Sequence, residues 1–457
     1  MDPFSTPHDE ILLNSIKPED ESQEEMIIRL IKQHDQSIKN YEVGQKYYDN
    51  HPDILDEPAK TDHDGQADAE KPDWRFTHNP HANLVDQKVG YMVGESPNYQ
   101  HDRKDVMKVI EQYLDFNFDD DLNDILTAAS NKGVEWLHPY VDEEGIFKML
   151  EIPAEQVIPI YADRKERQLK AVIRPYKKKD EYRVEYWTDT QVYYYLYQDE
   201  QLNLAWYHGI NENNPTTHLQ DESWGKVPFI PFKNNSQSVS DIWRYKVLID
   251  AMNRRSSDVQ NMFDESTELI YILKGYEGTD LAEFMKNLKY YKAINVDGDG
   301  GGVDTIRVEV PVESSNEWID KMRDWIYEYG RGVDFNRNEL GNSPSGIALR
   351  FLYSGLDLKT KQLARKTIPA IKQLLWFIFE FEDLGGDIAD EVDVTFNYNR
   401  MVNELEQSNI AGQSKDILSD ETVLQHHPWV ADVEKERKRI DEQDKTYGSE
   451  LPLGSDE

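Results

Sequence analysis

The side chains that could carry out chemistry fall into three groups, of which the first is histidine. His78 and His81 flank Asn79-Pro80, a spacing that a metal site could use. No acidic ligand on a predicted helix accompanies them, so ordinary turn histidines are the favoured interpretation. The same interpretation holds for the pair His426-His427.

The second group is a segment rich in aspartate and glycine, Asp297 to Asp304. It lacks the Gly-Lys-Ser/Thr ending of a phosphate-binding loop. It begins Asp-x-Asp, as a calcium loop does, but Val308 stands at the twelfth position, where such a loop needs glutamate. We therefore expect a flexible hairpin connection with no bound metal.

The third group is a row of carboxylates on a helix predicted over 312–331. Their spacing of 4, 3, 4 and 4 residues places all of them on one side of that helix. The row consists of Glu313, Glu317, Asp320, Asp324 and Glu328. Trp318, Met322, Trp325 and Tyr329 repeat this spacing and predict an adjacent apolar stripe. A solvated helix face would explain the acids, whereas the more specific interpretation is a helix that presents acid to a cavity or channel.

Catalytic motifs are missing from the sequence. It contains no Walker A sequence, no Gly-x-Ser-x-Gly and no His-Glu-x-x-His. Carboxylates are so abundant that no pair stands out as a general acid and base. We therefore predict a protein that is not an enzyme and that uses no cofactor.

Composition narrows the class of protein further. The 457 residues carry 51 basic and 88 acidic side chains, a net charge of −37, and no cysteine. These figures exclude a disulfide-stapled scaffold and argue against a basic coat on nucleic acid. Aromatic residues make up 11%, too many for a disordered polyacid, and the length favours several domains. The acidic stretch 1–25 lacks the pattern of a signal peptide, and the apolar run 374–379 is too short to span a bilayer. We therefore expect the protein in a reducing, cytosol-like compartment or in a particle assembled there.

Periodicity predicts the elements that must position these residues. Helices are expected over 24–48, from 83 to 94, and over 105–132, 240–268, 312–331, 346–384, 403–418, 420–426 and 433–444. Pro369 lies within the longest of them and should kink it. Strands are expected over 146–152, 171–176, 182–187, 191–197, 269–273 and 392–398. Residues 227–232, with two prolines, are expected to form an edge strand or a connector.

The order of these parts resembles the portal proteins of long-tailed double-stranded DNA bacteriophages, in the group found in phages of Gram-positive bacteria. Five collinear segments carry the resemblance: 36–48, 83–97, 133–136 with 158–161, 228–235 leading into 240–242, and 391–397 with 403–406. The resemblance implies an α+β multidomain fold, mainly helical, in a ring of twelve identical subunits at one capsid vertex. It divides the chain into an acidic N-terminal segment (1–30), a wing that is first helical and then β-rich (31–239), and a first stem helix (240–268). A small α/β clip (269–311), a second stem helix (312–331) and a tunnel loop (332–345) follow. The rest is a long kinked helix with a wing strand (346–400), a helical crown (401–445) and a tail (446–457).

The resemblance also assigns roles to residues. The five acids of 313–328 would line the DNA channel. The tunnel-loop residues would be Asn336, Arg337, Asn338, Glu339, Asn342 and Ser343, and the clip contacts would be Lys286, Lys289, Asp297 and Asp299. The implied partners are the terminase large subunit, the head-to-tail connector (adaptor), the major capsid and scaffold proteins, and the double-stranded DNA that is packaged and ejected. The implied location is the virion, after assembly in the host cytoplasm, with no membrane contact.

The charge agrees with this assignment on independent grounds. Residues 240–330 hold 11 bases and 18 acids. A protein that grips DNA needs lysine and arginine, because phosphate contacts dominate affinity, whereas one that lets DNA slide benefits from weak or repulsive contact. The alternative from another class is an acidic cytosolic carbohydrate-active hydrolase built on the aromatic region 182–206, with carboxylates as acid and base.

Overall fold

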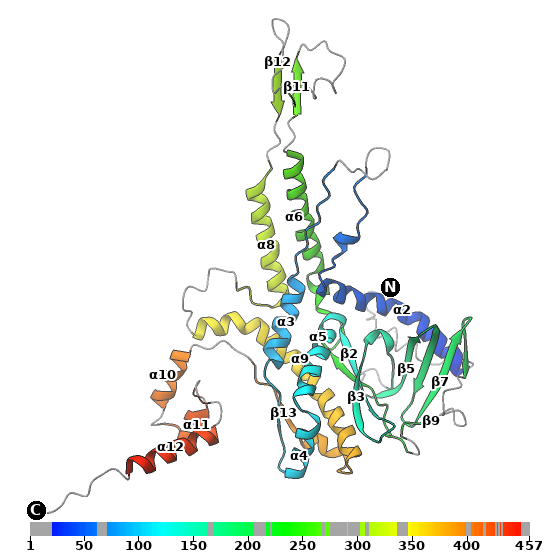
Figure 1. Ribbon diagram of the computed structural model, residues 1–457, viewed down its shortest axis with the longest axis vertical. Helices are drawn as coiled ribbons and strands as arrows, with labels where there is room; N and C mark the ends of the chain where they lie inside the picture. Colours follow the sequence, from blue (N-terminus) through cyan, green and yellow to red (C-terminus); the bar gives the residue numbers. More distant parts are fainter. Residues whose placement is uncertain are drawn as a thin grey trace, which may run out of the picture.

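The computed structural model describes residues 21–61, 71–162, 168–204, 216–219, 222–266, 270–274, 290, 302–306, 310–335, 346–398, 404–414, 417–425, 427, 430 and 433–448. Figure 1 shows a body of helices and sheets, a two-helix stem rising from it, and a strand pair at the far end of the stem. Within the part of the chain that is described, no helix combines the length and apolarity needed to cross a membrane.

Helices form the first part of the body: α2 (Gln23–Tyr48), the 3-10 turn η1 (Asp53–Asp56), α3 (Pro80–Val93), α4 (Lys104–Tyr113) and α5 (Phe116–Lys132). A capping box of Ser22 and Glu25 begins α2. The prediction for 83–94 starts too late, because Asn79 caps α3 and Pro80 takes its first position. The single helix expected over 105–132 is wrong, because the Asp115 side chain accepts the N–H groups of Asn117 and Phe118 and starts a second helix.

Two antiparallel sheets follow. One has the order β10-β2-β3, from Ile230–Lys233, Val134–Val141 and Phe147–Ile152, with the 3-10 turn η2 (Ala154–Gln156) after β3. The other runs β4-β5-β6-β7-β8, with β9 also on β7, from Ile158–Tyr161, Leu169–Lys178, Glu181–Trp187, Gln191–Gln198, Gln201–Leu204 and Thr216–Thr217. The strands expected over 146–197 are confirmed, and Pro231 lies on the edge strand β10, with Pro228 just before it. The β2 strand escaped prediction because its first six residues are all buried and so do not alternate.

The second sheet packs against α2. Ile27, Leu30 and Ile31 of the helix meet Ile173 and Val184 of the sheet in one core cluster. The tyrosines of β6 and β7 border this cluster: Tyr182, Tyr186, Tyr193 and Tyr197. The aromatic richness of this region therefore serves the packing of a helix on a sheet.

The long helix α9 (Gly346–Phe381) forms the centre of the largest core. Leu374, Leu375, Phe377 and Phe379 are fully buried in it against the helices α3 to α5. Pro369 lies inside α9, and the ribbon changes direction along its length (Figure 1). After the 3-10 turn η5 (Gly386–Glu391), strand β13 (Asp393–Thr395) pairs with β1 (Asn98–Gln100) and closes the body.

The stem consists of α6 (Lys246–Ser266), entered through the 3-10 turn η3 (Asp241–Arg244), and α8 (Val312–Gly330). At its far end β11 (Ile270–Lys274) pairs with β12 (Gly302–Ile306), so the strand expected over 269–273 is confirmed. The three C-terminal helices are α10 (Glu404–Ser414), α11 (Asp420–Gln425) and α12 (Val433–Gly448), close to the predicted ranges.

Candidate functional site

The stem helices pack as an antiparallel hairpin. Ile249 and Met252 of α6 share a core cluster with Met322 and Ile326 of α8. Gly330 of α8 lies beside the ring of Tyr245, the residue before α6: a Cβ added to the glycine would lie 3.3 Å from Cε1 of Tyr245. Ile242 and Tyr245, just before α6, and Ile249 and Met252 in its lower half are buried.

The apolar stripe predicted for α8 is wrong. Of its four members only Met322 is buried, whereas Trp318 is 48% exposed and Tyr329 is 50% exposed. The buried row is instead Ser315, Met322, Ile326 and Gly330. Small and aliphatic side chains occupy this row because α6 and the body approach closely: a Cβ on Gly330 would lie only 2.6 Å from Cδ1 of Leu84.

The five carboxylates lie on the open side of α8. Glu313, Glu317, Asp320 and Glu328 are exposed, and Asp324 is half-buried. At about 100° per residue, Asp324 lies about 160° around the helix from the buried Ile326. The acidic row therefore faces away from α6 along the whole length of α8, so this row is a surface and not part of the packing between the helices.

The end of α8 and the segment that follows it are held by two helices of the body and by α8 itself. The Gln87 amide of α3 donates to the backbone oxygen of Val333 at 2.8 Å and accepts from its N–H at 2.9 Å. Arg323 of α8 makes two hydrogen bonds of 2.9 Å to Asp334. Lys359 of α9 donates to the backbone oxygen of Gly330 at 2.9 Å. These hydrogen bonds hold the first residues of the predicted tunnel loop in place against the body and the stem.

A buried charge cluster joins the stem to the body. Asp241, at the entrance to α6, accepts from Lys88 of α3 at 2.6 Å and pairs with Lys359 of α9 at 3.0 Å. Asn234 bridges the first pair, at 2.7 Å from Lys88 and 3.1 Å from Asp241. Burial lowers the pKa of Lys88 to about 8. Burial alone would raise the pKa of Asp241, but the two lysines outweigh it and hold that pKa well below its usual range.

Sequence reasoning missed this cluster, although a signal was present. Lys88 occupies a helix whose neighbours Leu84, Val85, Val89 and Met92 are apolar. A cation in such a position requires a buried partner. Nothing in the sequence, however, indicates that the partner is Asp241, 153 residues away.

The other predicted site residues lie outside the described part of the chain. These are the tunnel-loop residues Asn336, Arg337, Asn338, Glu339, Asn342 and Ser343, and the clip residues Lys286, Lys289, Asp297 and Asp299.

His78 and His81 are engaged within the protein. The ring of His81 is buried, with Nδ1 at 2.8 Å from the Tyr245 hydroxyl, and His78 Nε2 lies 2.9 Å from the Ser256 hydroxyl. Among the described residues no cluster of three His, Asp or Glu side chains could hold a metal ion.

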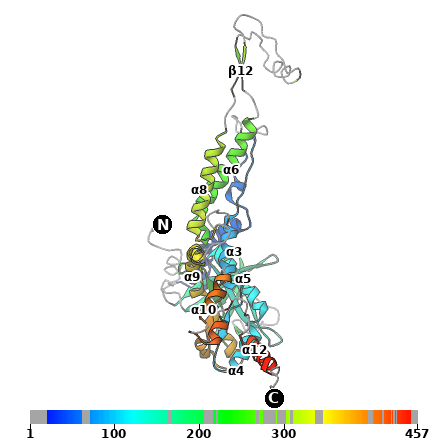
Figure 2. The same cartoon turned by 90° about the vertical axis from the view of Figure 1, so that its left-hand side faces the viewer.

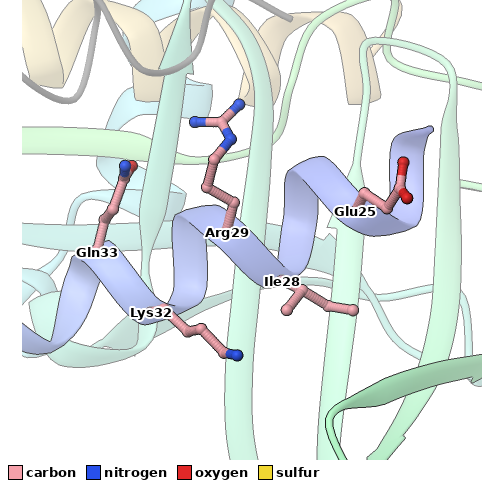
Figure 3. Close-up of a pocket in the computed structure, with 5 residues that line it drawn as sticks. All are labelled: Glu25, Ile28, Arg29, Lys32 and Gln33. Carbon is pink, nitrogen blue, oxygen red and sulfur yellow. The ribbon is translucent and has the colours of Figure 1, made fainter. Parts of the chain in front are cut away.

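In the described part of the aromatic region, 182–204, the carboxylate of Glu185 is engaged by neighbours in the sheet. Glu185 of β6 accepts from the indole of Trp187 at 3.0 Å and pairs with Arg174 at 3.4 Å. A surface hollow on α2 is lined by side chains of one helix only, Glu25, Ile28, Arg29, Lys32 and Gln33 (Figure 3). Its cations are already paired, Arg29 with Glu21 and Lys32 with Glu200.

Comparison with known proteins agrees with this architecture. The family model "Phage portal protein, SPP1 Gp6-like" matches residues 28–450. The portal protein of Bacillus phage SPP1 is 36% identical, over 96% of this chain and 90% of that protein. The portal protein of Clostridium phage phiCD119 is 31% identical, over 89% of this chain and 93% of that protein.

Among solved structures, a chain of the "Neck of native GTA particle computed with C12 symmetry" is similar, with a TM-score of 0.42 and 11% identity. The similarity covers 75% of this chain and 89% of that one. The family match and the two relatives extend over nearly the whole length, through body, stem and long helix alike. The chain belongs to the SPP1 Gp6-like family of phage portal proteins.

Proposed function

We propose that this portal protein forms a ring of twelve subunits at one capsid vertex, and that the acidic row of α8 lines the channel through which double-stranded DNA is packaged and ejected. The observation that carries the proposal is the position of the row. Its five carboxylates face away from α6, and four of them are exposed.

The physical reason is the sign of the charge. A phosphate backbone is attracted to lysine and arginine and gains affinity through each neutralised phosphate. A wall of carboxylates offers no such contact, so DNA next to it is held at a distance and moves without being trapped at any one register. Twelve copies of the row would surround the DNA with a uniform repulsive field at every height of the stem.

The arrangement of the other parts supports partners at both ends of the channel. The β11–β12 pair stands at the tip of the stem, farthest from the body (Figure 1). We assign the clip, 269–311, to contacts with the terminase large subunit during packaging and with the head-to-tail connector afterwards. The body and the C-terminal helices would face the major capsid and scaffold proteins, with assembly in the host cytoplasm.

The test reverses the charge of the row. Glu317→Lys with Glu328→Lys should leave ring formation intact but slow DNA packaging and strengthen DNA binding by purified rings. The new binding should weaken with salt, with a log–log slope of roughly −0.9 for each phosphate neutralised. Filter binding across a salt series measures this slope.

The matched control carries the same charge change away from the stem. Glu111→Lys with Asp120→Lys alters exposed positions on α4 and α5. Equal DNA binding and equal packaging rates in the two double variants would rule out a channel-lining role for the row.

A further inference from the structure

A strap of extended chain, residues 71–79, is fastened along one side of α6. The N–H groups of Trp74, Phe76 and His78 donate to the side chains of Asn261 (2.8 Å), Ser257 (2.9 Å) and Asn253 (2.8 Å). Two residues of extended chain advance about 6.6 Å and four residues of helix about 6 Å. Every second residue of the strap therefore lies opposite every fourth residue of α6. The side chains of Asn253, Ser257 and Asn261 are buried beneath the strap.

The strap is tied down from its other side as well. The Arg75 guanidinium donates to the backbone oxygens of residues 54, 55, 57 and 58. The rings of Trp74 and Phe76 nevertheless remain 55% and 42% exposed, and they stack on each other with centroids 6.5 Å apart. A rigid backbone thus presents an aromatic pair to the outside of the stem.

A second aromatic surface lies on α8. The rings of Trp318 and Trp325 meet edge to face with centroids 5.6 Å apart, and Tyr329 continues the row. Trp318 and Tyr329 are about half exposed. Nothing in the described part of the chain covers either aromatic surface.

The two aromatic surfaces lie on opposite sides of the stem. Asn253, under the strap, follows the inward-facing Met252 by one residue, and Trp325 precedes the inward-facing Ile326 by one residue. The chain runs up the stem in α6 and down it in α8. Seen from the tip, the step of about 100° from Met252 to Asn253 and the step of about 100° from Ile326 back to Trp325 therefore turn the same way. The two steps start from directions that point at each other. They therefore end on opposite sides of the plane of the hairpin. Figure 2 shows the blue strap beside α6.

The two surfaces also lie at the same height. Gly330 lies beside the ring of Tyr245, which places the two residues at about the same height. Trp318 is twelve residues above Gly330 on α8. Ser257 of α6, which holds Phe76, is twelve residues beyond Tyr245, the residue directly before α6. At about 1.5 Å per residue both stand about 18 Å up the stem.

We propose that the strap of one subunit receives the aromatic row of the next, Phe76 and Trp74 against Trp318 and Trp325. This contact rests on the proposed ring. A closed ring joins two different surfaces of the same chain, and rotation about an axis parallel to the stem preserves height. Level surfaces on opposite sides meet this requirement, whereas surfaces at different heights would generate a spiral.

The charges beside the two surfaces are complementary. Lys321 is exposed on the side of the aromatic row, where its Nζ lies 5.7 Å from the centre of the Trp325 ring, and Arg255 of α6 lies on the same side. Asp320 and Glu313 are exposed toward the strap side. Because Asp320 and Lys321 are consecutive, the Asp320 carboxylate of one subunit would lie at the height of the Lys321 ammonium group of the next subunit in the ring.

Cross-linking tests the contact directly, because the chain has no cysteine of its own. A Phe76→Cys, Trp318→Cys double variant treated with a short bismaleimide should give a ladder of covalent oligomers. A co-expressed mixture of the two single variants should give covalent dimers and nothing larger. The mixture excludes a link within one chain.

The matched control is Phe76→Cys with Tyr329→Cys, since Tyr329 lies about 16 Å lower on the same row. It should cross-link at least tenfold less. Rings seen by electron microscopy without the Phe76–Trp318 dimer would overturn the contact and leave the proposed function standing. Absence of rings would overturn both.

A second measurement does not depend on cysteine chemistry. Trp318→Ala and Phe76→Ala should each lower the urea concentration at which rings dissociate, and the double variant should lower it no further than the worse single variant. Fully additive effects would show that the two side chains act independently and would contradict the contact.

Discussion

At the scale of single residues, the junction of stem and body depends on one carboxylate shared by two lysines. Asp241 is 3% exposed, and its partners Lys88 and Lys359 are 1% and 6% exposed. A buried pair is costly to form, but removing one partner is costlier still, because the remaining charge is left without compensation.

Asp241→Asn should therefore lower the free energy of unfolding by about 3–5 kcal/mol, since it strands two buried cations. Lys88→Met should cost less, because the Asp241–Lys359 pair survives. Urea denaturation followed by tryptophan fluorescence measures both. Asp258→Asn, on the exposed face of α6, is the control and should change stability by less than about 0.5 kcal/mol.

Two buried histidines make stability depend on pH. Burial lowers the pKa of His81 to about 4 and that of His138 to about 4, against 6.5 when unfolded. The unfolded chain therefore binds these protons first, and stability falls as the pH drops below 6.5. Glu135, whose pKa burial raises to about 7, takes up a proton near the same pH and contributes with the opposite sign.

The histidine contribution is isolated by comparing variants. Between pH 6.5 and 5.5, above the pI of about 4.7, each histidine should lower the free energy of unfolding by about 1 kcal/mol. His138→Phe should remove its share of this slope. An identical slope in the variant and the unmodified protein, from urea denaturation at both pH values, would refute the assignment.

At the scale of elements, periodicity predicted most helices because their buried faces recur every three or four residues. It failed where a single capping side chain determines a helix boundary, as at Asp115, which starts a second helix within the one predicted. It also failed on α8, where aromatic residues follow helical spacing yet lie on the open flank. The acidic row was found from spacing alone, but the side it faces depends on which residues α6 covers.

The strap could not be predicted, since 71–79 has no periodicity and its partners lie about 180 residues away in α6. Replacing Asn253, Ser257 and Asn261 by alanine should release it, because three backbone N–H groups lose their acceptors. Limited trypsin digestion should then cleave after Arg75 at least several-fold faster. Asp258→Ala provides the control. Unchanged cleavage in the triple variant would show that these three hydrogen bonds do not hold the strap.

At the scale of the whole molecule, charge opposes assembly. In the proposed ring, twelve copies at −37 each would carry about −440, and the Debye length of about 10 Å at 0.1 M salt determines how much of that repulsion acts between neighbours. Contacts between apolar surfaces do not share this dependence on salt.

Rings should therefore dissociate as ionic strength falls and reform as it rises. Sedimentation velocity between about 0.01 and 0.5 M NaCl, where the Debye length shortens from 30 Å to under 5 Å, follows the change. Variants that remove negative charge outside the stem, such as Glu111→Gln with Asp120→Gln, should shift the midpoint to lower salt. Rings that weaken with added salt would instead indicate assembly by ion pairs.

The pairing of β1 with β13 has a consequence for synthesis. These strands join residues 98–100 to residues 393–395, and the largest core places α9 against helices from the first third of the chain. A nascent chain therefore cannot complete its body until almost all of it has left the ribosome, because the contacts that close it are separated by nearly 300 residues. A subunit whose strap and stem have already left the ribosome therefore still lacks a closed body until residues 393–395 follow.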